Sequence, residues 1–179
     1  MDAAVSTLRE GGSRALTQPR VARVAGVAQG HLTYYFPTRT DLWREVAEQS
    51  VRRIVAGLDA VVAAAPSDPA DMAHMVAVPL LAAANDRVLV GLAMEADRDP
   101  HLRAAFSGLV SQVRERVRVL LGTLGVDADD ELVAGVHAAG VGLAVLFLGL
   151  GEPAVAELEV ALRTLLEAVV AGRSRDAGP

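Results

Sequence analysis

Apolar residues recur along this chain with the three-to-four-residue spacing of helix faces, and short polar or Gly/Pro segments separate these stretches. The clearest case is residues 42–65, where Trp43, Ala47 and Val51 begin a stripe that continues through Val62. The pattern predicts further helices over residues 2–10, 18–25, 29–35, 70–84, 85–96, 100–122, 130–151 and 153–171. No stretch alternates between apolar and polar residues as a half-buried strand does. We therefore expect an all-α fold of about nine helices.

Residues 17–46 begin with two short helical patterns joined by a tight turn. Thr17 can cap the first helix with its hydroxyl, and Pro19 falls in the first turn, where no intrahelical N–H is needed. Gly26 can end this helix in a left-handed conformation, and we expect Val27 to plug the core between the two helices. A helix, a glycine turn and a second helix with a polar outer face suit the major groove of DNA.

The second helix, over residues 29–35, is the expected recognition helix, with Leu32 and Phe36 pointing inward. Its outer face offers Gln29, Gly30, His31, Thr33, Tyr34 and Tyr35. Gln, His and Thr side chains can bond base edges, tyrosine hydroxyls commonly serve phosphates, and glycine allows close backbone approach. From the preceding helix, we expect DNA contacts by Thr17, Gln18 and Arg20.

A capping box follows this motif. Thr38 can cap the next helix, and Asp41 takes the place of the usual Glu. Arg39 lies in the first turn of that helix, so we expect it to face a phosphate.

The segment resembles the DNA-binding domain of TetR-type transcriptional regulators. The residues that match the family pattern are Gly26, Val27, Gly30, Leu32, Phe36 and Pro37, with Arg39 at the usual Lys position. Ala28, His31 and Thr33 depart from it on the outer face, which puts the operator sequence in doubt rather than the fold. The resemblance implies a helix-turn-helix head over residues 1–46, a ligand-binding and dimerisation body over 47–172, and a polar tail over 173–179.

Charge is divided between these parts. The chain has a net charge of −5, yet residues 1–45 hold six arginines against four carboxylates, so the head is weakly positive and the body acidic. This polarity suits phosphate binding at one end. The chain has no cysteine, which excludes disulfides, a thiol nucleophile and Cys-zinc sites. No basic segment followed by an apolar run marks a signal peptide, so we expect a cytoplasmic protein.

Residues 132–151 carry no charged side chain and are long enough to span a bilayer. Acidic flanks and the lack of nearby Lys or Arg favour a buried helix over a membrane span, although the membrane interpretation stays open. TetR-type proteins dimerise through their last two long helices, which implies a homodimer here. The expected interface residues are Leu132, Val136, Gly140, Val141, Leu143, Phe147, Leu158, Leu162 and Leu165.

The family resemblance also implies a cavity for a small ligand, and the many Ala, Val and Leu residues favour an apolar one. The candidate ligand residues are His74, Met75, Met94, Phe106, His137 and Phe147. A Met or Phe at helical spacing is more often plain core. The histidines are too scattered in sequence to predict a metal site, and no cofactor is expected.

Together these observations predict a homodimeric repressor that binds a near-palindromic double-stranded DNA operator and releases it on binding the ligand. Two alternatives stay open. One is an all-helical enzyme, for which no nucleophile, metal or phosphate-loop motif is visible. The other is a helical dimer that acts by protein contact without DNA.

Overall fold

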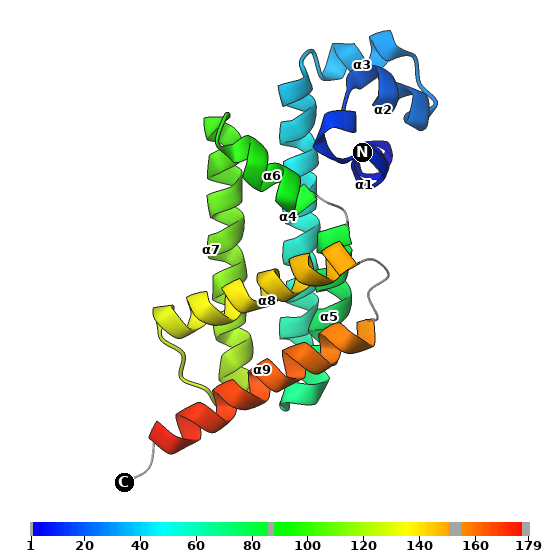
Figure 1. Cartoon of the computed structure of the whole chain (residues 1–179). Helices are drawn as coiled ribbons and strands as arrows, with labels where there is room; N and C mark the ends of the chain where they lie inside the picture. Colours follow the sequence, from blue (N-terminus) through cyan, green and yellow to red (C-terminus); the bar gives the residue numbers. More distant parts are fainter. Residues whose placement is uncertain (1, 86–87, 151–154, 177–179) are drawn as a thin grey trace. The chain divides into compact units, whose positions relative to one another are not determined.

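The computed structural model describes residues 2–85, 88–150 and 155–176, which form nine α-helices and no strand (Figure 1). The all-α prediction is therefore confirmed. In chain order the helices are α1 (Asp2–Ala15), α2 (Gln18–Ala25), α3 (Gln29–Tyr35), α4 (Arg39–Ala64), α5 (Pro69–Asn85), α6 (Val88–Ala96), α7 (Pro100–Thr123), α8 (Asp130–Leu150) and α9 (Val155–Asp176).

Most helix boundaries follow the local signals, with exceptions at α1, α4, the α5–α6 connection and α9. Helix α4 begins at Arg39 rather than at Leu42, and α9 continues to Asp176, into the predicted polar tail, rather than ending at residue 171. The first helix continues to Ala15 rather than ending near residue 10, and it passes a non-helical Gly12 (φ 65°, ψ −168°). Asn85 ends α5 instead of opening the next helix, which begins at Val88. The predicted opening at residue 86 and the predicted start of the last helix at residue 153 lie outside the described residues.

The chain divides into two compact units. Unit 1 is Met1–Arg53 with Ala83–Leu109, and unit 2 is Ile54–Ala82 with Val110–Pro179. Unit 1 therefore holds α1, α2, α3 and α6 together with the first parts of α4 and α7. Unit 2 holds the later parts of α4 and α7, most of α5, and α8 and α9.

The core of unit 1 gathers around Trp43, whose side chain is 1% exposed, with Leu8, Leu16 and Leu92 packed in the same cluster. Leu8 of α1 is fully buried in this cluster. Helix α6 approaches the indole ring at Gly91. A Cβ built on Gly91 would lie 2.6 Å from Trp43 Cη2, so glycine permits this close packing.

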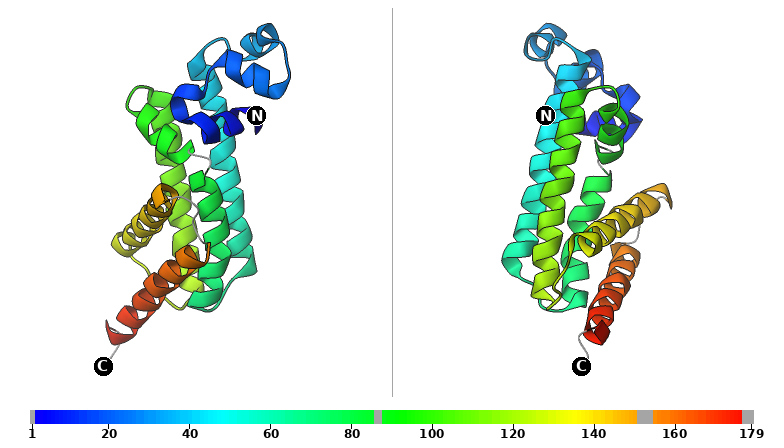
Figure 2. Two further views of the ribbon diagram at one scale, coloured as in Figure 1. Left: turned by 45° about the vertical axis from the view of Figure 1, so that its right-hand side comes forward. Right: turned by 90° about the vertical axis from the view of Figure 1, so that its left-hand side faces the viewer.

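In unit 2 the buried cluster includes Met72, Leu121, Val133, Phe147 and Leu158. Helices α8 and α9 lie side by side in this unit (Figures 1 and 2). Each contributes one face to the cluster, so the remaining face of α8 is left to solvent in the single chain.

The outward face of α8 is unusually apolar. Val141, Val145 and Leu146 are 37%, 45% and 55% exposed. By length and composition alone this helix could cross a membrane, since Asp130–Phe147 has a mean hydropathy of 1.5 and 11% of that window is buried within the chain. The side chains of Val141, Val145 and Leu146 form an apolar strip on the surface of the single chain.

Candidate nucleic-acid interface

The turn between α2 and α3 depends on one glycine. Gly26 adopts φ 68° and ψ 26°, the left-handed conformation expected at a helix C-terminus. The N–H of Val27 then donates to the carbonyl of Ala22 at 3.0 Å, which closes the helix end. Val27 itself is 40% exposed, so the prediction that it plugs the core between the helices is wrong. The reversal at Gly26 directs this side chain outward.

Thr17 occupies the predicted N-cap of α2, with an extended backbone (φ −127°, ψ 148°). Its side chain makes no capping hydrogen bond, contrary to the sequence prediction; its carbonyl instead accepts from Val21 N–H at 2.9 Å. The neighbouring Gln18 has a structural contact that the sequence did not indicate. Gln18 Nε2 donates to the carbonyls of Phe36 at 2.6 Å and Pro37 at 2.9 Å, which ties α2 to the end of α3.

Helix α3 spans the predicted residues and has no buried residue. Leu32 and Phe36 are half-buried against the unit 1 core, which confirms their inward orientation. Helices this short are not stable by themselves in water. The two apolar anchors and the Gln18 amide therefore hold α3 in place and leave its outer face free.

That outer face is fully open. Gln29, Gly30, His31, Thr33, Tyr34 and Tyr35 are all exposed. The exposed fraction reaches 79% for Tyr34 and 62% for Tyr35. The Tyr35 ring meets those of His31 and Tyr34 edge-on, each at 5.2 Å between centroids. Edge-to-face contacts limit ring motion and so present these polar groups in a defined arrangement.

Arg39 lies in the first turn of α4 as predicted, but its guanidinium is engaged inside the chain. Nε donates to the Leu16 carbonyl at 3.2 Å and Nη2 donates to the Ser13 carbonyl at 2.8 Å. Nη2 also lies 3.4 Å from Glu95 Oε1. Arg39 thus ties the C-terminal end of α1 to the start of α4, a role that the phosphate prediction did not foresee.

Nη2 of Arg20, also predicted to contact DNA, lies 3.6 Å from Glu10 Oε2, and its buried Nε has no hydrogen-bond partner among the residues that the structure describes. Its position suits packing between α1 and α2. The phosphate role of Arg20 and Arg39 stays a prediction, and these contacts compete with it.

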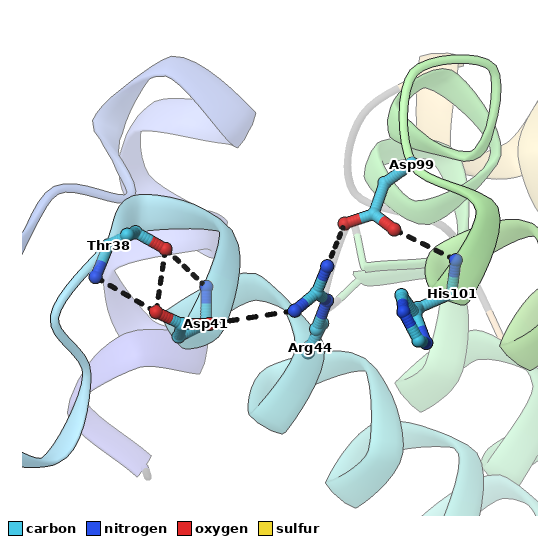
Figure 3. A network of polar contacts seen from close by, with 5 residues as sticks. All are labelled: Thr38, Asp41, Arg44, Asp99 and His101. Carbon is cyan, nitrogen blue, oxygen red and sulfur yellow. Dashed lines mark hydrogen bonds and ion pairs between the residues drawn. The ribbon is translucent and has the colours of Figure 1, made fainter.

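A polar network organises the start of α4 (Figure 3). Thr38 N–H donates to Asp41 Oδ2 at 3.0 Å, and Asp41 N–H donates to Thr38 Oγ1 at 3.1 Å, so the predicted capping box is confirmed. Hydrogen bonds from the Thr38 hydroxyl and then its backbone N–H hold the pKa of Asp41 below its ordinary value. The box fixes where α4 begins, immediately after the recognition helix.

The network extends within unit 1 through Arg44, which donates from Nη2 to Asp99 Oδ2 at 3.1 Å (Figure 3). Asp99 Oδ1 accepts from His101 N–H at 2.8 Å and so caps α7; an Asp N-cap followed by Pro at the first helical position is a local start signal of a helix. Burial raises the pKa of Asp99, but the His101 N–H and the Arg44 cation outweigh it and keep the pKa below its ordinary value. This ionised pair connects α4 to the start of α7.

The six predicted ligand residues are divided between the two units. Met94 and Phe106 belong to unit 1, whereas His74, Met75, His137 and Phe147 belong to unit 2. Met94 is 61% exposed, so it cannot line an enclosed cavity in this conformation. The side chain of His74 is 70% exposed and its Nδ1 lies 3.0 Å from Glu159 Oε2.

The three remaining ligand candidates of unit 2 are buried or half-buried. Phe147 is buried in the core cluster and Met75 packs against it. His137 is half-buried on α8. Burial first, and then the charge of Arg114, hold the pKa of His137 below its ordinary value of 6.5, which favours a neutral imidazole.

The predicted dimer residues also separate into two groups. Phe147, Leu158 and Leu162 are buried in the chain's own core and cannot offer surface to a partner. The other six keep some exposed surface. Val141 is exposed, and the half-buried residues are Leu132, Val136, Gly140, Leu143 and Leu165. Val145, Leu146 and Val160, which the prediction did not include, are exposed on α8 and α9. No periodicity in so apolar a helix as α8 could reveal its outward face.

Two family models match the chain. Residues 1–46 match "Bacterial regulatory proteins, tetR family", and residues 67–172 match "Tetracyclin repressor-like, C-terminal domain". No curated protein matches the chain closely enough to serve as a relative.

Several solved structures share the fold. A transcriptional regulator from Rhodococcus sp. Rha1 has a TM-score of 0.80 at 23% identity, with 96% of this chain and 94% of that chain covered. A TetR transcription regulator from Haloarcula marismortui has a TM-score of 0.74 at 21% identity, with coverage of 95% and 94%. The multidrug binding protein EbrR, complexed with imidazole, has a TM-score of 0.61 at 25% identity, with coverage of 92% and 90%.

Proposed function

The chain belongs to the TetR family of DNA-binding transcription regulators, and we propose that it is a repressor that binds a near-palindromic operator as a homodimer and releases it when a small apolar ligand binds. The observation that best supports operator binding is the exposure of the outer face of α3. This face is entirely exposed, polar and aromatic, and it is held from behind by Leu32, Phe36 and the Gln18 amide. A cytoplasmic location is part of the proposal.

Substitutions at Thr33 and Tyr34 test whether α3 contacts DNA, because both side chains are exposed and neither packs in the core. DNA fragments selected by the purified protein define the operator. Thr33→Ala and Tyr34→Ala should then each weaken operator binding by about 1–3 kcal/mol, or roughly 5- to 150-fold, if each removes a base or phosphate contact.

Ser67→Ala is the matched control, since Ser67 is an exposed hydroxyl in the α4–α5 connection. Its affinity should equal that of the original chain. Unchanged affinity in both α3 variants, with the helical circular dichroism spectrum intact, would remove α3 from the proposed DNA interface.

The proposed dimer interface is the exposed face of α8, with Val160 of α9 beside it. Val141, Val145 and Leu146 line this face, and Gly135 and Gly142 on the same helix allow close approach of a second helix. Two copies related by a two-fold axis would bury the face against itself. Two heads would then meet successive major-groove turns, roughly 34–36 Å apart.

Val145→Arg places an unpaired charge in that interface and should split the dimer in sedimentation at micromolar concentration. Val78→Arg is the matched control, because Val78 is 56% exposed on α5 and lies outside the proposed face. A protein that sediments as a monomer before any substitution would refute the dimer. A protein that dissolves only with detergent would support the membrane interpretation of α8.

The proposed ligand site lies among the interior residues of unit 2. Met75, His137 and Phe147 are retained for it, whereas His74 and Met94 are not, because both are largely exposed. The likeness to EbrR, described as a multidrug binding protein, supports an apolar ligand. A neutral His137 would offer one hydrogen bond in apolar surroundings.

A further inference from the structure

Unit 1 contains a surface pocket that is separate from the recognition face and from the unit 2 core. Its volume is about 390 Å³, within the range of small-molecule sites. Three segments far apart in the sequence build it: the end of α1, the start of α4 and the end of α6 with the residues that follow. The lining residues are Ser13, Arg14, Arg39, Met94, Glu95 and Arg98.

The charges of this arginine pocket are not balanced. Glu95 is its one carboxylate, and it lies 3.4 Å from Arg39 Nη2 and 3.9 Å from Arg98 Nη1. Within the described part of the chain, the Arg14 side chain makes no hydrogen bond or ion pair. The pocket therefore holds three guanidinium groups and one carboxylate, in a chain whose overall charge is −5. A positive pocket on an acidic protein selects for anions.

The arrangement of these groups indicates which anion fits. One arginine fork can satisfy a planar carboxylate, whereas three guanidinium groups from different segments can surround a tetrahedral oxyanion. Met94, which is 61% exposed, provides an apolar wall beside them. Glu95 occupies the place that an anionic ligand would take between Arg39 and Arg98.

We propose that the arginine pocket binds a small soluble molecule bearing a phosphate group, held by Arg14, Arg39 and Arg98 in competition with Glu95 and, at Arg39, with the carbonyls of Ser13 and Leu16. This ligand differs in charge and in place from the apolar ligand proposed for unit 2. By joining the end of α1, the start of α4 and the end of α6, it would tighten unit 1, which carries the recognition helix. Trp43 is a built-in reporter, since it is the only tryptophan and packs against Gly91 of α6.

The test uses the full chain without DNA. Inorganic phosphate and pyrophosphate are titrated by calorimetry at constant ionic strength, with sodium chloride as the competing salt. The Arg14→Ala/Arg98→Ala variant should bind these probes about tenfold or more weakly, because two charge-assisted hydrogen-bonding groups are lost. Glu95→Gln should bind them more tightly, because it removes the internal competitor. That gain of affinity is not expected from a residue with only a structural role.

Arg52→Ala is the matched control. Arg52 is an exposed arginine of unit 1 that pairs with Glu45 and Glu48 outside the pocket, so its loss should leave the affinity unchanged. In the original chain, pyrophosphate should also change Trp43 emission and raise the thermal midpoint.

Two results would overturn the proposal: no phosphate or pyrophosphate binding above the chloride background, or equal binding by the Arg14→Ala/Arg98→Ala variant. A separate salt titration of DNA binding distinguishes the sources of phosphate. If the free chain binds neither probe and the double substitution reduces the salt slope by about two units, these arginines contact the DNA backbone instead. Because the probes are titrated without DNA, failure here leaves the proposed operator binding untouched.

Discussion

Gly91 sets how closely α6 can pack against α4 in unit 1, and its replacement by alanine makes that packing measurable. The added Cβ would lie 2.6 Å from Trp43 Cη2, and the indole is 1% exposed, so it has no free space to move into. Two effects oppose each other. Alanine favours a helix over glycine by about 0.8–1 kcal/mol, whereas overpacking a filled core costs about 1–3 kcal/mol.

A control substitution separates these effects. Gly108 lies inside α7 and has nothing within 4 Å of a built Cβ, so Gly108→Ala gains helix propensity without a clash. The free energy of unfolding of Gly91→Ala should therefore fall below that of Gly108→Ala by about 1–3 kcal/mol. Urea unfolding at matched protein concentration, followed by Trp43 fluorescence, measures the difference.

The reasoning fails if the two variants are equally stable. Trp43→Phe provides a second check, because phenylalanine lacks the ring carbon that the new Cβ would meet. Combining Trp43→Phe with Gly91→Ala should therefore cost less than the sum of the single changes, measured by circular dichroism. An additive result would place the strain elsewhere.

Three further predictions concern the head and unit 2. Gln18→Ala should destabilise the head by about 1–3 kcal/mol, because two hydrogen bonds to the end of α3 are lost, and faster amide exchange across α3 measures this. Thr38→Ala removes the cap of α4 and should lower the thermal midpoint. In the original chain, ionised Asp41 stabilises the fold because its pKa is lower in the folded chain than the ordinary value of 3.8. This stabilisation should be lost as the pH falls below 3.8. Because the pKa of His137 is lowered in the folded chain, His137 of the unfolded chain is protonated first as the pH falls. The free energy of unfolding should therefore decrease as the pH drops through 6.5 and become constant below the pKa of His137 in the folded chain. His137→Gln should flatten that part of the urea-midpoint profile against pH, and an unchanged profile would assign the effect to another group.

Features that depend on neighbours within one helical turn could be predicted from the amino-acid sequence. The left-handed turn at Gly26, the Thr38–Asp41 box and the Asp99 cap of α7 all lie where the residues predict them. These signals are local, since the donor, the acceptor and the backbone conformation lie within a few residues of each other. The limits of α3 follow for the same reason.

Roles that depend on partners distant in the sequence became visible only in the folded chain. Arg39 reaches carbonyls and a carboxylate 23 to 56 positions away, so nothing near it in the sequence could show that its donors are engaged within the chain. Gln18 likewise meets carbonyls 18 and 19 positions away. In α8 the residues are apolar on every side, so only contact with other elements determines that Phe147 is buried and Val145 is exposed. Burial is a property of the neighbours a side chain acquires on folding, and helical periodicity loses its information when every face of a helix is equally apolar.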